Sequence, residues 1–163
     1  MKINKNTKWS DIAVVYANAN QQERIRVEDL CAERIFGEGG CWAITIGDFI
    51  ELTEGRKVES FVKQGEAIGI LATFAVRRWV EQVMEILKKL VPPIKSNDVS
   101  SLTIEMSFAE SMLVFCRDYF GTQSFDVASK VAMSDYILAR KDFYNKIVQQ
   151  QAINNRINNS IKK

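Results

Sequence analysis

The chain has 163 residues, of which 47% are hydrophobic, 26% charged and 10% aromatic, and 22 Lys and Arg residues nearly balance 20 Asp and Glu residues. This length and composition fit one globular domain and exclude a disordered chain or a disulfide scaffold. The sequence contains no histidine, so it lacks the commonest general base and the commonest metal ligand. We therefore expect neither an enzyme nor a protein that binds a metal or a cofactor.

The three cysteines, Cys31, Cys41 and Cys116, form no CxxC pair that could hold zinc. Residues 1–6 are polar and lack the apolar core of a signal peptide. The longest apolar run covers residues 67–76, about half of the roughly twenty residues that a membrane-spanning helix needs. We expect reduced, mostly buried thiols in a cytoplasmic protein without a membrane segment.

The first forty residues predict two helices. Apolar residues with helical spacing follow Ser10, which is a candidate N-cap for the first helix. This helix is expected to end near residues 18–20. The second helix then runs to Gly37, which stands where a C-terminal glycine belongs. Residues 38–40 are expected to form a flexible loop.

Residues 41–55 carry two conflicting patterns. Trp42, Ile44 and Ile46 alternate as in a strand, whereas Thr45 and Asp48 have the spacing of a capping box with a shorter acid. We favour a short helix over residues 46–53 that ends near Gly55. A short strand before this helix stays an alternative.

Residues 58–91 predict a long helix that Pro92 and Pro93 end. The first half is broadly apolar, so this helix is expected to be the central and most buried element. Its second half carries a narrow apolar seam suited to packing on another helix. The seam consists of Val76, Val80, Val83, Leu87 and Leu90.

The remainder of the chain predicts a polar surface loop over residues 94–103 and three more helices. Ser107 and Glu110 form a capping box for a helix that ends at Gly121. Ser124 can cap a short helix through Val131, and Ser134 with Asp135 can cap a longer one. The predicted fold is all-α: a single compact bundle of about six helices with one long central helix.

The last fifteen residues differ in character from the helical domain expected over residues 1–148. Ile153, Ile157 and Ile161 recur one helical turn apart, but Gln, Asn, Arg and Lys surround them. A stripe this narrow cannot hold a helix on the protein's own core. Residues 149–163 therefore predict either a disordered tail or a helix that docks on a protein partner, which includes a second copy of the chain.

Catalytic and nucleic-acid functions have weaker support. Cys116 lies in an aromatic segment, and the sequence has no histidine that could activate its thiol. Glu110 is already assigned to the capping box. Two basic pairs are candidates for contacting phosphates, Arg77 with Arg78 and Lys162 with Lys163. A small nucleic-acid-binding regulator that uses these four residues is the alternative, and the formal charge of +2 disfavours it.

Two segments resemble small helical tail-assembly proteins of long-tailed phages. Residues 44–52 (ITIGDFIEL) match the opening of that group, and residues 107–121 with 139–145 resemble its later helices. These proteins are similar to chaperones that coat the tape-measure protein and recruit tail-tube subunits. The resemblance implies an all-α, non-enzymatic protein-binding chaperone in the host cytoplasm. The predicted helices before residue 40, and the lack of an evident second-domain extension, depart from the group's pattern.

Overall fold

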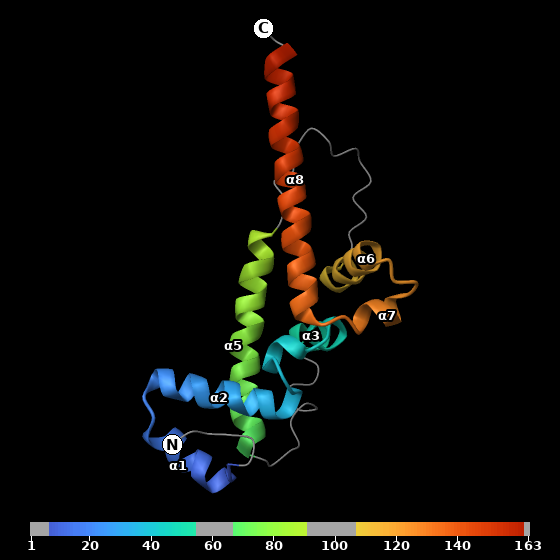
Figure 1. Cartoon of the computed structure of the whole chain (residues 1–163). Coiled ribbons are helices and arrows are strands. Elements are labelled where there is room, and N and C mark those ends of the chain that lie inside the picture. The colour runs from blue at the N-terminus through green and yellow to red at the C-terminus, as the bar shows by residue number, and fades with distance from the viewer. Residues whose placement is uncertain (1–6, 55–66, 91–106, 162–163) are drawn as a thin grey trace.

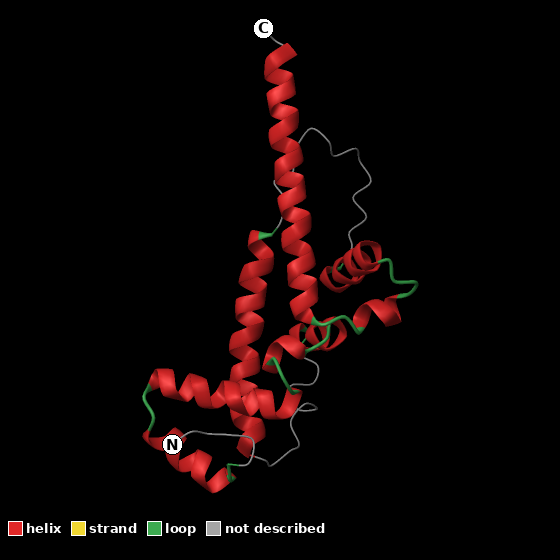
Figure 2. Cartoon of the chain, viewed as in Figure 1, coloured by secondary structure: helices red, strands yellow, loops and turns green. Residues whose placement is uncertain are grey.

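A computed structural model describes residues 7–54, 67–90 and 107–161. These residues form seven α-helices and one 3₁₀ helix and no strand, which confirms the all-α prediction (Figures 1 and 2). The α-helices are α1 (Trp9–Asn18), α2 (Gln21–Phe36), α3 (Ile46–Thr53), α5 (Ala67–Lys89), α6 (Phe108–Phe120), α7 (Phe125–Ser129) and α8 (Met133–Ile161). The 3₁₀ helix, η1, covers Gly40–Ala43.

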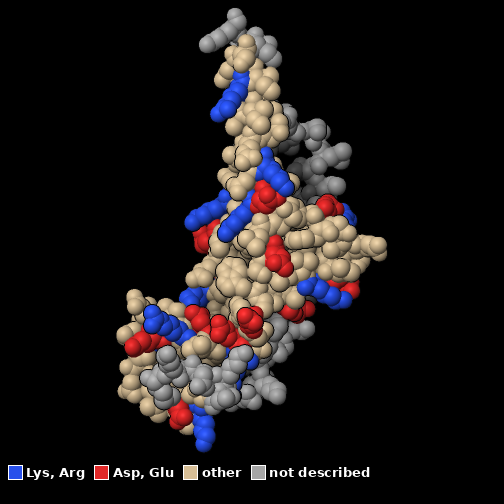
Figure 3. Space-filling model, viewed as in Figure 1, with Lys and Arg blue, Asp and Glu red and all other residues tan. Residues whose placement is uncertain are grey.

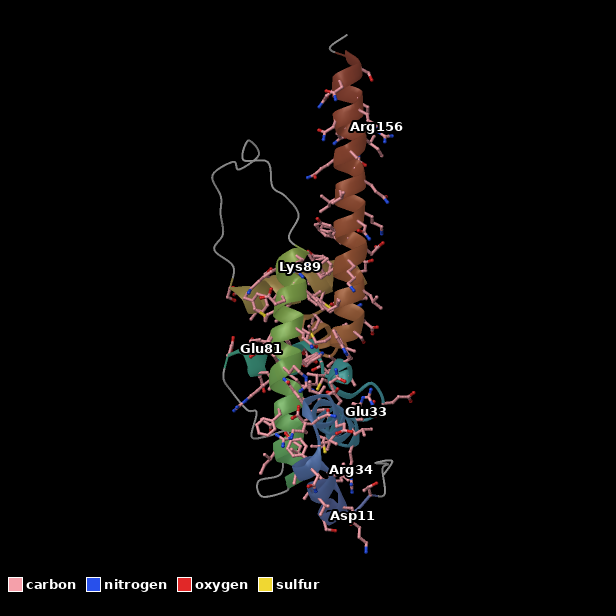
Figure 4. All side chains as sticks on the ribbon, turned by 90° about the vertical axis from the view of Figure 1, so that its left-hand side faces the viewer. Asp11, Glu33, Arg34, Glu81, Lys89 and Arg156 are labelled. Atoms are coloured by element: carbon pink, nitrogen blue, oxygen red, sulfur yellow. The ribbon has the colours of Figure 1, made fainter. Side chains whose placement is uncertain are left out.

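The two long helices, α5 and α8, set the long axis of the molecule, and the shorter helices are arranged along it (Figure 1). Figure 1 shows α1 and α2 at one end of the molecule, with α2 crossing α5, and α3, α6 and α7 near the start of α8. One cluster of buried side chains draws on all of these helices, so they share a single core. Both Figure 1 and Figure 4 show α8 extending well past the end of α5.

The centre of the core is aromatic. Phe49 of α3 is fully buried, and its ring meets Trp79 of α5 edge to face at a centroid distance of 5.5 Å. Trp42 meets the same indole edge to face at 5.7 Å. Edge-to-face pairs of this kind stabilise beyond the area that they bury. This aromatic cluster therefore packs η1 and α3 against α5.

The α5 seam lies in the core as predicted. Val76, Val83 and Leu87 are buried, and Val80 is half-buried. The first half of α5 also contributes buried residues to this core, including Leu71 and Ala75, as expected for a central helix. Ile70 and Phe74 of the same half are nevertheless 55% and 42% exposed, so the burial is confined to one side of the helix.

Most helix ends match the sequence signals. Gly37 and Gly121 have positive φ angles of 88° and 64° and end α2 and α6. Ser107 and Glu110 form both hydrogen bonds of a capping box, and Ser124 caps α7. The helix after Ser124 ends at Ser129 and not at Val131. Local side-chain chemistry therefore sets these boundaries.

Two predicted caps are wrong. Ser10 lies inside α1, whose N-cap is Lys8 and has no side-chain hydrogen bond. Ser134 lies inside α8, which begins at Met133. The start of α8 is set by a tertiary contact: the Met133 N–H donates to Ile44 O and the Ile46 N–H donates to Val131 O, both at 2.9 Å. Side-chain patterns do not reveal such backbone pairing.

Residues 38 and 39, within the predicted loop, form a turn, and the ambiguous segment before α3 contains no regular strand. Gly40 begins η1, and Thr45 forms an isolated antiparallel bridge with Ala132. α3 covers residues 46–53 as predicted, and the Thr45 side chain accepts a hydrogen bond from the Asp48 N–H at 3.2 Å. A Cβ on Gly47 would lie 3.2 Å from Ser129 Cβ, so a larger residue would require Ser129 to shift where α3 and α7 meet.

Several predictions fall outside the described residues: Gly55, the start of the long helix at 58–66, Pro92 and Pro93, and the loop at 94–103. The tail predicted at 149–163 is helical as far as Ile161, where it forms one continuous helix with residues 133–148. The described helices include none that is long and apolar enough to cross a membrane.

The buried thiols make stability depend on alkaline pH. Burial raises the pKa of Cys31, Cys41 and Cys116 from 9.0 to about 11, so the folded state favours the neutral thiols. Their contribution to stability is complete below pH 9 and is lost as the pH rises toward 11. We expect the free energy of unfolding, measured in urea, to fall through this range. Cys116→Ala should make the fall shallower, and an unchanged slope would contradict this account.

Candidate protein-binding surface

The C-terminal part of α8 extends beyond the body of the protein (Figures 1 and 4). Ala139 is its last buried residue, and every side chain described over residues 152–160 is exposed. We call residues 152–161 the projecting end. Ile153 and Ile157 on it are 49% and 52% exposed. Ile161 is the last residue of the helix, and its side chain is outside the described part.

The exposed isoleucines continue a face of α8 that packs inside the protein. Phe143 and Ile157 lie about four helical turns apart, and Tyr136 precedes Phe143 by about two turns, so the three residues share one side of the helix. Tyr136 is buried and Phe143 is 39% exposed. This side of α8 therefore passes from the core, across a half-covered region, to the open projecting end.

A groove lies between α6 and α8 where this face leaves the core. It has a volume of about 580 Å³. Its floor is aromatic: Phe115 of α6 meets Phe143 edge to face at 5.5 Å and stacks on Tyr119 at 5.4 Å. We call it the α6–α8 groove; its lining residues are Ser111, Val114, Phe115, Asp118, Tyr119, Arg140 and Phe143.

One cation in this groove has no carboxylate partner in the described part of the chain. The Arg140 guanidinium lies over the Phe115 ring, with Cζ 4.6 Å from the centroid. Its Nε is buried and forms no hydrogen bond. Buried nitrogen donors are almost always hydrogen-bonded in proteins, so this atom marks an incomplete environment.

The two acids beside the groove are already neutralised. Asp118 pairs with Arg117 at 2.8 Å, and Asp142 pairs with Lys146 at 2.6 Å. The Tyr119 hydroxyl also donates to Asp142, at 2.5 Å. The hydrogen bonds from Lys146 and Tyr119 lower the pKa of Asp142, while the bond to Asp142 raises the pKa of Tyr119. These pairs leave Arg140 as the uncompensated charge of the groove.

The structure describes two of the four residues of the nucleic-acid alternative, Arg77 and Arg78 on α5. Arg78 is held against α2 by ion pairs with Glu28 and with Asp29, the latter at 2.6 Å. Arg77 is exposed, and Lys162 and Lys163 lie outside the described residues, after the end of α8.

The described residues offer few groups for metal binding or for thiol chemistry. Within residues 7–54, 67–90 and 107–161, no three Cys, Asp or Glu side chains gather as they would around a metal ion. All three thiols are free and buried, and burial disfavours the reactive thiolate. The exposed apolar face of α8 and the α6–α8 groove together form the candidate binding surface.

The sequence predicted the isoleucine stripe but neither the groove nor the unpaired Arg140 within it. The available signal was the spacing of Arg140, which stands one turn after Tyr136 and one turn before Phe143 on an otherwise apolar face. A cation in such a position is either covered by an acid or left for a partner. Spacing alone does not distinguish these cases, because the covering acid could come from any element.

Comparisons with protein-family models, with curated proteins and with solved structures find no match to this chain.

Proposed function

We propose that the protein is a non-catalytic helical module that binds a helix of another polypeptide along the projecting end of α8. The observation that carries this proposal is the half exposure of Ile153 and Ile157 on a helix that extends beyond the protein's own core. Short helices are marginal in water without tertiary packing, so such an end gains stability from a partner that covers its apolar side.

The spacing of the exposed isoleucines suits packing against another helix. Helices dock through apolar anchors at positions i, i+3, i+4 and i+7. Ile153 and Ile157 have the i, i+4 spacing, and the α6–α8 groove lies further along the same face. Covering each isoleucine would contribute on the order of 1 kcal/mol, since about half of each side chain is already out of water.

We propose phage tail assembly as the biological setting. Its support is the resemblance of residues 44–52 and 107–121 to small tail-assembly proteins, together with the open helical surface. The partner would then be a tape-measure or tail-tube protein. A tape-measure gene directly downstream, and co-purification of its product with this chain on co-expression, would support this setting. Failure of every neighbouring tail protein to co-purify would remove it.

The binding surface can be tested by a single charge on the isoleucine stripe. Helical peptides are selected on the full chain from a displayed library with a leucine stripe and random flanking residues. We expect Ile157→Asp to weaken the selected peptides by at least about tenfold, because a buried unpaired carboxylate opposes docking. The urea midpoint should stay unchanged, since Ile157 contacts solvent. Affinity is measured by fluorescence anisotropy.

Asn159→Asp is the matched control for this substitution. It adds the same charge two residues further along the helix, on the opposite side from Ile157. We expect it to leave binding within about twofold of the wild type. Equal affinities of both variants for every selected peptide would show that the projecting end is not the binding surface.

A further inference from the structure

We infer that the partner helix is acidic: the α6–α8 groove and the projecting end of α8 bind an amphipathic helix with Asp or Glu beside its apolar stripe. One of these carboxylates pairs with Arg140. This inference rests on the proposed function and specifies the chemistry of the partner.

The first support is the charge of α8 beyond the groove. Asp142 is the last acidic residue of the sequence, and every charged residue after it is basic: Lys146, Arg156, Lys162 and Lys163. Figure 3 shows blue and no red on the described part of the projecting end, where Figure 4 labels Arg156. Complementary charge steers association and selects among partners. A basic helix end with an apolar stripe therefore fits an acidic amphipathic partner.

The same charge disfavours a second copy of the chain as the occupant. Pairing two projecting ends would place basic residues against basic residues, with no acid on either side. Like charges along a helix contact destabilise it. The described acids nearest to this face, Asp118 and Asp142, are already engaged by Arg117 and Lys146.

The second support is the state of Arg140. Its Nε is buried without an acceptor while the guanidinium is fixed over Phe115 at the groove. A guanidinium presents a planar fork of donors that matches the two oxygens of a carboxylate. A partner carboxylate at the groove would neutralise the cation, while an aliphatic neighbour on the partner would cover Phe143.

The distance along α8 sets the length of the partner. Arg140 and Ile157 are separated by about 25 Å at 1.5 Å per residue, so a helix of four to five turns would reach both. Between them α8 carries Phe143 and Ile147 and then the uncharged residues 149–151, all glutamine, and Lys146 is already paired to Asp142. Duplex nucleic acid is bound chiefly through many phosphate contacts from Lys and Arg, which this face does not offer.

The experiment uses the composition of the selected peptides. The displayed library described above draws its flanking residues equally from Asp, Glu, Lys, Arg, Ser and Gln. We expect Asp and Glu to exceed Lys and Arg among the peptides that bind the full chain. We also expect Arg140→Glu to weaken these peptides by at least about tenfold and Arg140→Gln to weaken them less. Arg26→Glu, an exposed charge reversal on α2, is the control and should leave binding unchanged.

Each other outcome would overturn the inference. Selected peptides without an acidic excess that still fail to bind Ile157→Asp would retain the proposed function and discard the acidic partner. Equal affinity of Arg140→Glu and Arg26→Glu for the selected peptides would show that Arg140 does not pair with a partner carboxylate. A dimer in light scattering that Ile157→Asp abolishes would identify a second copy as the occupant. Tighter binding to duplex DNA than to any peptide, at about 50 mM salt, would favour nucleic acid. Peptides that bind Ile157→Asp normally would reject the proposed function itself.

Discussion

Replacing Phe49 by alanine is expected to lower the free energy of unfolding by about 3–5 kcal/mol, a large part of what a domain of this size possesses. Phe49 is fully buried, so its removal forfeits the transfer free energy of a whole aromatic ring and leaves a cavity. It also removes the edge-to-face contact with Trp79 that joins α3 to α5. Urea denaturation followed by far-ultraviolet circular dichroism measures the change.

Phe74→Ala provides the matched control for this substitution. Phe74 lies on α5 and is 42% exposed, so the same truncation removes much less buried area. We expect a loss of about 1 kcal/mol or less, since surface truncations rarely cost more. Equal losses for Phe49→Ala and Phe74→Ala would show that the α3–α5 contact is not the centre of the core.

Local signals in the sequence predict most of this fold because they act over a few residues. The capping box at Ser107 and Glu110 forms both of its hydrogen bonds, and Gly37 and Gly121 take the positive φ angles that favour glycine. The seam along α5 is buried because its 3–4 spacing fixes one side of a helix.

Features that depend on tertiary contacts are not visible in the sequence. The start of α8 depends on backbone hydrogen bonds between residues 44–46 and 131–133, which no local pattern encodes. The exposure of Ile70 and Phe74 on the central helix also depends on which elements pack against it. An apolar run indicates that a helix tends to be buried but not how many neighbours surround it.

The candidate site divides in the same way. The isoleucine stripe follows from spacing on α8 alone, and the surplus of polar neighbours indicated that it would not pack on the core. The α6–α8 groove requires the relative placement of Phe115 and Phe143, which lie on different helices. The lack of a described acid beside Arg140 also depends on that placement, so it emerges only in three dimensions.

A second large effect is expected at the buried carboxylate of Glu28. This residue is only 7% exposed. Arg78 neutralises its carboxylate through an ion pair, and the Tyr16 hydroxyl donates a hydrogen bond to it at 2.8 Å. Breaking a buried pair from one side costs more than the pair contributes, because the remaining charge stays out of water. Arg78 thus has a structural role that a surface arginine would lack.

Replacing Arg78 by methionine should therefore lower the free energy of unfolding by about 2–3 kcal/mol. Methionine retains an aliphatic side chain but leaves the Glu28 carboxylate with the Tyr16 hydrogen bond and no cation from α5. The expected cost is below the full range for a buried pair, because the Arg78 side chain is itself 27% exposed. Asp29→Asn should cost about 1 kcal/mol or less, since the Asp29 side chain is 59% exposed.

A double-mutant cycle with Glu28→Gln separates the charge effect from packing. The neutral amide does not need a cation, so Arg78→Met should cost less in the Glu28→Gln background than in the wild type, by about 1–2 kcal/mol. Arg77→Met is the matched control on the same helix and should change stability by no more than about 0.5 kcal/mol, because Arg77 is exposed. Urea denaturation measures both comparisons: the midpoint should shift while the dependence of the unfolding free energy on urea concentration stays the same. Equal losses for Arg77→Met and Arg78→Met would show that the Glu28 ion pair does not hold α2 against α5.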